Sequence, residues 1–161
     1  MTTPTDSLLR QAAALHQRGA LTQAAEIYRQ VLLTDPRNTD ALHLLGVAET
    51  QGGNPQTGLE LIDRSLQLNP QQPVAVVNRG NCLMALRRFQ DALACYETAL
   101  GSAPTYVLAH FGRGNALAML SQPAQALASF ERAAELAPGF LGALAGCSGA
   151  LLQLRRLPAP P

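Results

Sequence analysis

The fold is decided by two stretches that repeat one pattern, AVVNRGNCLMALRRFQDALACYETAL at residues 75–100 and AHFGRGNALAMLSQPAQALASFERAAEL at residues 109–136. Within each stretch, apolar or small residues recur three or four positions apart, which is typical of one face of an α-helix. This spacing occurs twice in each stretch, so each stretch predicts two helices. Equivalent residues of the two stretches stand 34 positions apart. A fixed period of this length indicates a chain built from repeated helical hairpins.

The same period extends over nearly the whole chain of 161 residues. It contains a proline column, a column of small residues and a column of large, mostly aromatic residues. Proline ends helices because it lacks a backbone N–H and restricts the residue before it. We therefore expect closely packed helix pairs, with the aromatic column filling the space between successive pairs. The three columns are Pro36, Pro70, Pro104 and Pro138; Ala24, Gly58, Ala92 and Ala126; and Tyr28, Ile62, Tyr96 and Phe130.

These columns resemble those of the tetratricopeptide repeat (TPR), a 34-residue helical hairpin. In the TPR register the chain divides into repeats at 5–38, 39–72, 73–106 and 107–140, a final unpaired helix at about 141–155 and a proline-rich tail at 158–161. The resemblance implies a single TPR domain over residues 1–161, all-α, whose antiparallel helix pairs form a right-handed solenoid. Residues 75–100 and 109–136 are also similar to the repeats that precede the catalytic region in bacterial O-GlcNAc-transferase-like proteins and TPR sulfotransferases.

Composition and charge exclude several classes of function. All 12 basic residues are Arg, so a Schiff-base lysine and a P-loop lysine are excluded. A formal net charge of +1 provides no field that would hold the chain on nucleic acid or on an anionic membrane. The sequence has no run of about 18 apolar residues that would cross a bilayer, and its N-terminus lacks the pattern of a signal peptide. We therefore expect a cytoplasmic protein that neither binds nucleic acid nor inserts into a membrane.

The side chains that could perform catalysis are scattered along the sequence. His16, His43 and His110 fall on different predicted helices without metal-ligand spacing, and the three cysteines form no CxxC pair. The Gly-x-Gly at Gly112–Gly114 falls inside a predicted helix, whereas a nucleotide-binding fingerprint follows a strand. We therefore expect no enzyme activity, no cofactor and no metal site.

The TPR resemblance implies that the first helix of each pair lines a concave surface. Asn78, Asn81 and Asn115 would form a row of amides there, and an amide can donate to and accept from the backbone of an extended peptide. In O-GlcNAc-transferase repeats an asparagine ladder holds peptide in this way, and Asn78 occupies the ladder position. The alternative is that Asn81 and Asn115 cap or bridge neighbouring helices and bind no ligand. The expected peptide-binding residues are Asn78, Asn81, Asn115, His43, Val47, Val77, Met84, Phe111 and Met119.

The predicted last helix lacks the polar outer face that a terminal repeat needs. Residues 141–154 read LGALAGCSGALLQL and contain no charged residue. Their glycines lower helix propensity by about 3 kcal/mol in total, relative to alanine. Such a helix needs a neighbour, which is either a longer solenoid or another chain. The residues that we expect to be buried in that contact are Leu141, Leu144, Leu151, Leu152 and Leu154.

Three hypotheses about function follow from these patterns. The first is a protein-interaction scaffold that binds a partner peptide or helix in the concave groove. The second is the substrate-recognition arm of a glycosyltransferase or sulfotransferase whose catalytic domain is missing from this sequence. The third is a scaffold that self-assembles into a homo-oligomer through the last helix. The sequence does not identify the partner, because TPR specificity lies in a few surface side chains.

Overall fold

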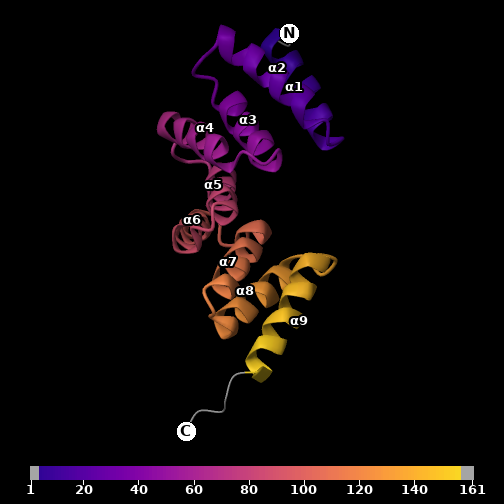
Figure 1. The fold of residues 1–161 in the computed structure, drawn as a ribbon, viewed down its shortest axis with the longest axis vertical. Helices are drawn as coiled ribbons and strands as arrows, with labels where there is room; N and C mark the ends of the chain where they lie inside the picture. Colours follow the sequence, from indigo (N-terminus) through magenta and orange to yellow (C-terminus); the bar gives the residue numbers. More distant parts are fainter. Residues whose placement is uncertain (1–3, 157–161) are drawn as a thin grey trace.

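The computed structural model describes residues 4–156, and within this range all the regular secondary structure is α-helical (Figure 1). The expectation of an all-α fold is therefore confirmed for these residues. Each helix packs against the next one along the chain, and the helices form a row with the first pair at one end and the last helix at the other. The helices are α1 (Pro4–Gln17), α2 (Leu21–Thr34), α3 (Thr39–Gln51), α4 (Pro55–Leu68), α5 (Pro73–Ala85), α6 (Phe89–Ser102), α7 (Val107–Met119), α8 (Pro123–Leu136) and α9 (Leu141–Arg156).

Proline and asparagine set several of the helix starts. Pro55, Pro73 and Pro123 occupy the first turns of α4, α5 and α8. Proline suits this position because the first N–H groups of a helix have no partner within it. Asn38 precedes α3, and its side chain accepts a hydrogen bond of 3.0 Å from the backbone N–H of Ala41. This is the bond that favours asparagine as an N-cap.

The turn between the two helices of each pair has the same backbone conformation in every repeat. Gly19, Gly53, Arg87 and Ser121 all have positive φ, at 78°, 91°, 59° and 60°. These four residues stand 34 positions apart. Only glycine adopts this left-handed region without steric cost. Arg87 and Ser121 adopt the same conformation although neither is glycine, so glycine is not required for this turn.

The aromatic column forms the core between successive helix pairs. Tyr96 is 1% exposed and lies between two glycines, Gly80 of its own repeat and Gly112 of the next. A Cβ atom built on Gly80 would lie 2.8 Å from the Tyr96 ring, and one on Gly112 would lie 2.5 Å from it. Phe130 lies in the same way between Gly114 and Gly146. The expectation that Tyr96 and Phe130 fill the space between hairpins is therefore confirmed.

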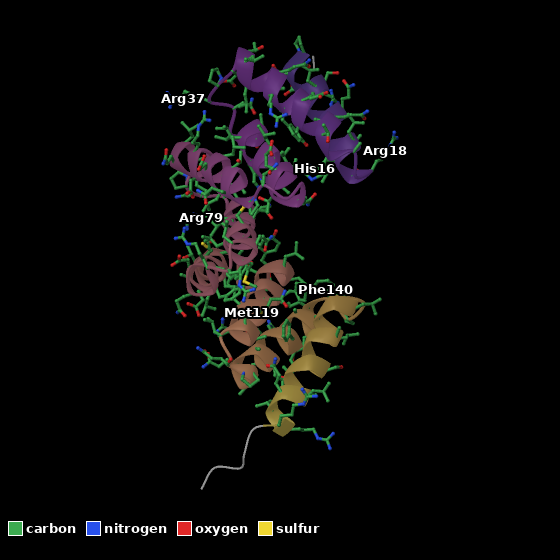
Figure 2. The ribbon with its side chains drawn as sticks, viewed as in Figure 1. His16, Arg18, Arg37, Arg79, Met119 and Phe140 are labelled. Atoms are coloured by element: carbon green, nitrogen blue, oxygen red, sulfur yellow. The ribbon has the colours of Figure 1, made fainter. Side chains whose placement is uncertain are left out.

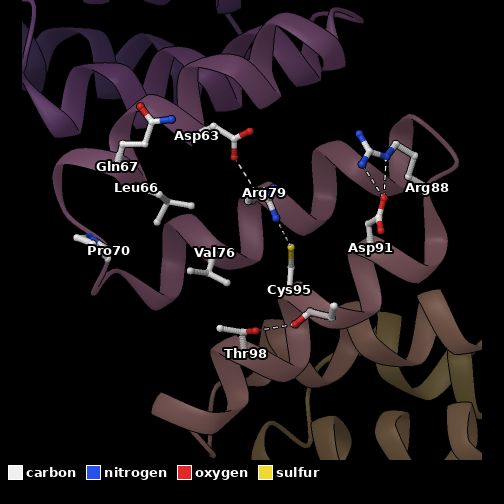
Figure 3. Close-up of a pocket in the computed structure, with 11 residues that line it drawn as sticks. Asp63, Leu66, Gln67, Pro70, Val76, Arg79, Arg88, Asp91, Cys95 and Thr98 are labelled. Carbon is white, nitrogen blue, oxygen red and sulfur yellow. Dashed lines mark hydrogen bonds and ion pairs between the residues drawn. The ribbon is translucent and has the colours of Figure 1, made fainter.

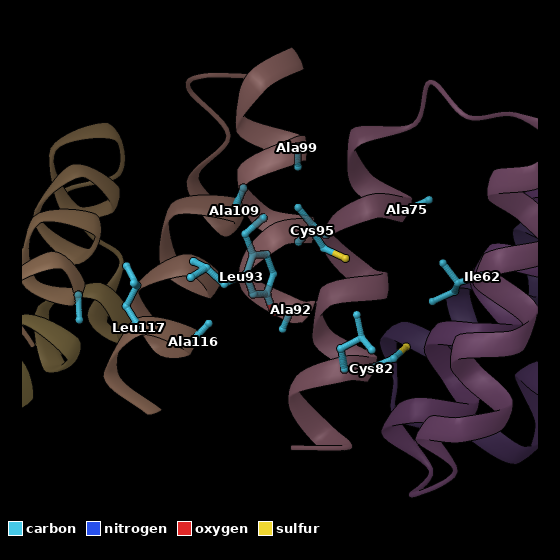
Figure 4. Close-up of a cluster of buried hydrophobic side chains, with 14 of the residues drawn as sticks. Ile62, Ala75, Cys82, Ala92, Leu93, Cys95, Ala99, Ala109, Ala116 and Leu117 are labelled. Carbon is cyan, nitrogen blue, oxygen red and sulfur yellow. The ribbon is translucent and has the colours of Figure 1, made fainter. Parts of the chain in front are cut away.

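The buried side chains form one extended core from α4 to α9 and a smaller one in α1 to α3. Figure 4 shows part of the larger core, where Ile62, Cys82 and Leu117 come from three successive repeats. Alanine and cysteine make up much of it, so the helices approach closely. Among residues 4–156, no helix combines the length and the apolar content that crossing a bilayer requires.

Candidate protein-interaction surface

The first helices of the repeats form the inner face of the solenoid. Contacts run in series from α1 to α3, α3 to α5, α5 to α7 and α7 to α9. The second helices α2, α4, α6 and α8 make no such contacts with one another. A row of helix pairs that is closer together on one side curves toward that side, so the first helices line the concave surface.

Two of the three predicted asparagines lie in a chain of hydrogen bonds that crosses this surface. Tyr96 Oη donates to Asn81 Oδ1 at 2.8 Å, and Asn81 Nδ2 donates to Asn78 Oδ1 at 3.2 Å. Asn78 Nδ2 in turn lies 2.8 Å from His43 Nε2, which belongs to the preceding repeat. Asn81 therefore does bridge α5 to α6, as the alternative interpretation held. Asn78 joins α5 to α3.

The direction of this chain determines the state of the His43 ring. An amide nitrogen only donates, so His43 Nε2 must accept, and the neutral ring carries its proton on Nδ1. Burial lowers the pKa of His43, and the nearby Asp40 carboxylate opposes that change. The neutral form that the hydrogen bond requires is thus also the form that burial favours.

We expect the free energy of unfolding to fall as the pH is lowered from about 7.5 to about 5.5. The folded-state pKa of His43 lies below the ordinary value of 6.5, so the unfolded chain takes up the proton more readily. Stability from this residue is complete above about pH 6.5 and is lost as the pH falls toward the folded-state pKa. Thermal melts across this range should show a smaller decrease for His43→Gln than for the wild type. Parallel pH profiles for the two proteins would contradict the assignment.

The remaining predicted residues differ in how well the structure exposes them. Asn115 is partly buried and makes no hydrogen bond to another described side chain. Met119 is 51% exposed, and Leu108 on the same helix is 49% exposed. Val77 is only 1% exposed because it belongs to the core, so the expectation that it lines the groove is corrected. The residues that remain partly exposed are Asn115, His43, Val47, Met84, Phe111 and Met119.

Phe111 is held in place by an aromatic cluster at the C-terminal half of the surface. Its ring centroid lies 4.8 Å from that of Phe140 in an edge-on arrangement and 5.9 Å from that of Phe130. These separations are in the favourable range for aromatic pairs. A rigid apolar side chain at this position costs little conformational entropy when a partner covers it.

The two halves of the concave surface differ in charge. The N-terminal half carries the charged residue Asp40. It also contains a polar pair that joins α1 to α3, in which His16 Nε2 lies 2.9 Å from Gln51 Oε1. Met119 and Phe140 lie in the other half (Figure 2). The inner positions of α5 and α7 carry no charged residue; they are Val74, Asn78, Asn81, Met84, Leu108, Phe111, Asn115 and Met119.

A hollow lies on the opposite, convex side of the described residues. It has a volume of about 640 Å³ between the second helices α4 and α6, with α5 as its floor (Figure 3). Arg79 crosses it, donating to Asp63 Oδ1 at 2.6 Å and to Cys95 Sγ at 3.2 Å. A second ion pair, Arg88 with Asp91, lies on its rim. The four charges sum to zero, so the hollow has no net attraction for an ion of either sign.

Sequence reasoning missed this hollow, although the repeat register contains a signal for it. Val76 lines it, and the equivalent residues one repeat away are the larger Leu42 and His110. Leu42 is fully buried, and His110 Nε2 lies 2.8 Å from the carbonyl oxygen of Pro104. The smaller valine therefore leaves space at this repeat position that the larger leucine and histidine fill in the neighbouring repeats.

The described His, Cys, Asp and Glu side chains are spread over the fold. No group of three or more His, Cys, Asp or Glu side chains in this range is placed to hold a metal ion. Burial raises the pKa of both the Cys82 and the Cys95 thiols, which disfavours the nucleophilic thiolate. Cys82 Sγ lies 3.0 Å from Thr50 Oγ1 and acts as a small core residue.

The leucines of the last helix are exposed. Leu141, Leu144, Leu151 and Leu152 are 77%, 44%, 49% and 56% exposed, and Leu154 is partly buried. No described helix covers the first four. The predicted tail at 158–161 lies outside the described residues.

Comparisons with known proteins agree on the type of repeat. The sequence profile of the tetratricopeptide repeat matches residues 9–73 and 77–139. Tetratricopeptide repeat protein 8 of Caenorhabditis elegans is 28% identical over 76 residues, which are 47% of this chain and 15% of that protein. The chain thus spans a small part of that relative.

Solved structures share the fold. The structure of Pseudomonas aeruginosa PilF matches with a TM-score of 0.85 and 22% identity, over 94% of this chain and 69% of that one. MamA from Desulfovibrio magneticus RS-1 matches with a TM-score of 0.75 and 18% identity, over 97% and 94% of the two chains. The APC/C hetero-tetramer Cut9–Hcn1 gives a TM-score of 0.84 and 16% identity, over 89% of this chain and 29% of the other. These likenesses show the fold; the narrower resemblance to transferase-associated repeats stays a prediction.

Proposed function

The chain belongs to the tetratricopeptide repeat family, and from this premise we propose that it is a protein-interaction scaffold that holds a partner segment on the inner face of α5 and α7. The observation that carries this proposal is a group of amides beside adaptable apolar side chains on the inner face of α5 and α7, where the inner positions carry no charge. Cut9 has a similar fold and forms part of a hetero-tetramer with Hcn1. This supports a role for the present chain in holding proteins together. The proposal assigns the chain no catalytic activity of its own.

The amides keep part of their hydrogen-bonding capacity for a partner. An asparagine side chain has two N–H donors and an oxygen with two lone pairs. Asn78 uses one N–H on His43 and one lone pair for Asn81, so it retains one donor and one acceptor. A peptide backbone offers the same pair of groups at each residue. Asn115 makes no hydrogen bond to another described side chain, so its amide keeps its donors and its acceptor.

The neighbouring side chains indicate a partner segment with few charges. Met84 and Met119 are flexible and polarisable, so they can repack around different apolar side chains. Phe111 adds a rigid anchor. A charged partner side chain would lose hydration here without gaining an opposite charge, because the inner positions of α5 and α7 have none. We therefore propose an extended or helical peptide that presents apolar side chains and an accessible backbone.

The test measures a selected peptide against variants that leave the fold intact. A phage-displayed library of random linear peptides is selected on the protein, and the affinity of the recovered peptide is measured by fluorescence anisotropy. We expect Asn115→Ala/Met119→Ala to weaken binding about tenfold, since one hydrogen bond and one apolar contact are lost. Asn78 and Asn81 are left unchanged because they support the internal chain to Tyr96.

The matched control is Gln90→Ala, which removes an exposed amide from the second helix α6. It should bind the peptide like the wild type. Equal affinity of the wild type and the Asn115→Ala/Met119→Ala variant would refute the groove assignment.

A second candidate is the substrate-recognition arm of a glycosyltransferase or sulfotransferase. It is supported by the resemblance of residues 75–100 and 109–136 to the repeats of such proteins. In this case the groove would hold the acceptor peptide and a separate domain would perform the transfer. A reading frame that continues into a catalytic domain would favour this candidate.

A further inference from the structure

The last helix exposes the face that a second helix covers in every earlier repeat. In α5 and α7 this face includes Leu83 and Leu117, each 1% exposed beneath α6 and α8. The equivalent residue of α9 is Leu151, which is 49% exposed. Leu144 is equivalent to the fully buried Leu42 of α3, yet it is 44% exposed. The face of α9 is therefore built to be covered, and no described helix covers it.

The opposite end of the solenoid is built to stay uncovered. One repeat position in α3, α5, α7 and α9 is occupied by an alanine, and all four alanines, Ala41, Ala75, Ala109 and Ala143, are fully buried. The equivalent residue of α1 is Ser7, which is exposed, and Gln11 is exposed beside it. Each leucine of α1 is partly buried. An apolar C-terminal end does not match this polar N-terminal end, which disfavours stacking of one copy head-to-tail on another.

The exposed face of α9 is instead close to symmetric about its own centre. Leu144 lies on one side of Ser148, and Leu151 and Leu152 lie on the other. Ser148 Oγ donates to the carbonyl oxygen of Leu144 at 3.2 Å, so the hydroxyl group is satisfied within its own helix. A Cβ atom built on the neighbouring Gly149 would have no neighbour within 4 Å, so a second backbone can approach there. A contact between identical copies about a two-fold axis requires a self-complementary patch of this kind.

We propose that two copies of this chain pair through α9, with the two helices antiparallel and the two-fold axis beside Ser148. Leu144 of each copy then packs against Leu151 and Leu152 of the other, so that each α9 covers on its partner the face that a second helix covers in the earlier repeats. The surface involved is separate from the groove of α5 and α7. One helix per copy buries less than the roughly 800 Å² per partner of a stable interface, so the dimer should dissociate in the micromolar range, at about 10–100 µM.

Sedimentation equilibrium of the full chain tests the pairing. The mass should rise from 17.0 kDa toward twice that value as the concentration increases through this range. Leu151→Glu should raise the dissociation constant at least tenfold, because it places charge in the apolar contact. The control is Leu33→Glu on α2, where the wild-type leucine is 84% exposed, and it should leave the constant unchanged. A mass of 17.0 kDa at every concentration would overturn the proposal.

Disulfide trapping tests the geometry. In a Cys147→Ser background, Ser148→Cys should form a disulfide-linked dimer under mild oxidation, since the two sulfurs would face each other across the axis. Cys82 and Cys95 are buried and should not compete. A mixture of Ser7→Cys and Ser148→Cys proteins should give no mixed disulfide above the level of random collision. A preferred mixed disulfide would show head-to-tail stacking and contradict the two-fold arrangement.

Discussion

Replacing Tyr96 with alanine should lower the free energy of unfolding by about 4 kcal/mol. The ring is 1% exposed and contacts glycines of two successive repeats, so its loss leaves a cavity between α5, α6 and α7. The substitution also removes the donor that holds Asn81 in place. Urea denaturation followed by far-UV circular dichroism measures the change, because the chain has no tryptophan for fluorescence.

Two conservative variants separate the contribution of the hydroxyl group from that of the ring. Tyr96→Phe keeps the ring and removes the hydrogen bond to Asn81, so we expect a loss of about 1 kcal/mol. Tyr28 occupies the equivalent position two repeats earlier, and its buried hydroxyl has no hydrogen-bond partner among the described residues. Tyr28→Phe should therefore leave stability unchanged or raise it. Equal losses for the two variants would show that the Tyr96 hydrogen bond contributes nothing.

Replacing Gly58 with alanine should lower the free energy of unfolding by about 2 kcal/mol, although alanine occupies the equivalent position in the three other repeats. A Cβ atom on Gly58 would lie 2.6 Å from the carbonyl oxygen of Gly46, and it would also overlap the Thr50 hydroxyl group. Backbone atoms cannot rotate away, so α3 and α4 would have to separate. Helix propensity favours alanine by only about 1 kcal/mol, which does not compensate.

Gly101→Ala is the control for this prediction. Gly101 also lies inside a helix, but a Cβ atom there would have no neighbour within 4 Å. Alanine should raise stability at this position by up to about 1 kcal/mol. If both substitutions stabilise the protein to the same extent, the close approach of α3 and α4 is not a constraint on Gly58.

The sequence predicts the helix pairs and their core because both depend on residues that recur every 34 positions. The column that contains Tyr96 illustrates this. A large ring that recurs together with columns of glycine and alanine packs into the space that these small residues leave. The conformation of Arg87 and Ser121 was not predicted, because neither residue type favours positive φ. Gly19 and Gly53 occupy the equivalent positions of the first two repeats. Comparing the repeats could therefore have predicted positive φ at Arg87 and Ser121, whereas their residue types alone could not.

Contacts between repeats were harder to predict than contacts within them. The chain from His43 to Tyr96 depends on how far α3 is rotated relative to α5, which the period does not specify. Val77, which was expected to line the groove, belongs to the core instead. The sequence of residues 141–154 predicted a helix that needs a neighbour, because it is rich in leucine and has no charge; the structure shows Leu141, Leu144, Leu151 and Leu152 exposed within the described residues.

We propose that a partner segment binds to the inner face of α5 and α7. The most direct measurement is a ¹H–¹⁵N NMR titration of the protein with the peptide selected from the library. We expect that the amide signals that shift most belong to residues 108–119 of α7 and to the inner positions of α5, together with the Asn115 side-chain NH₂ group. If the shifts instead cluster around Asp63, Arg79 and Thr98 on the convex side, the partner binds in the outer hollow and the groove assignment is wrong.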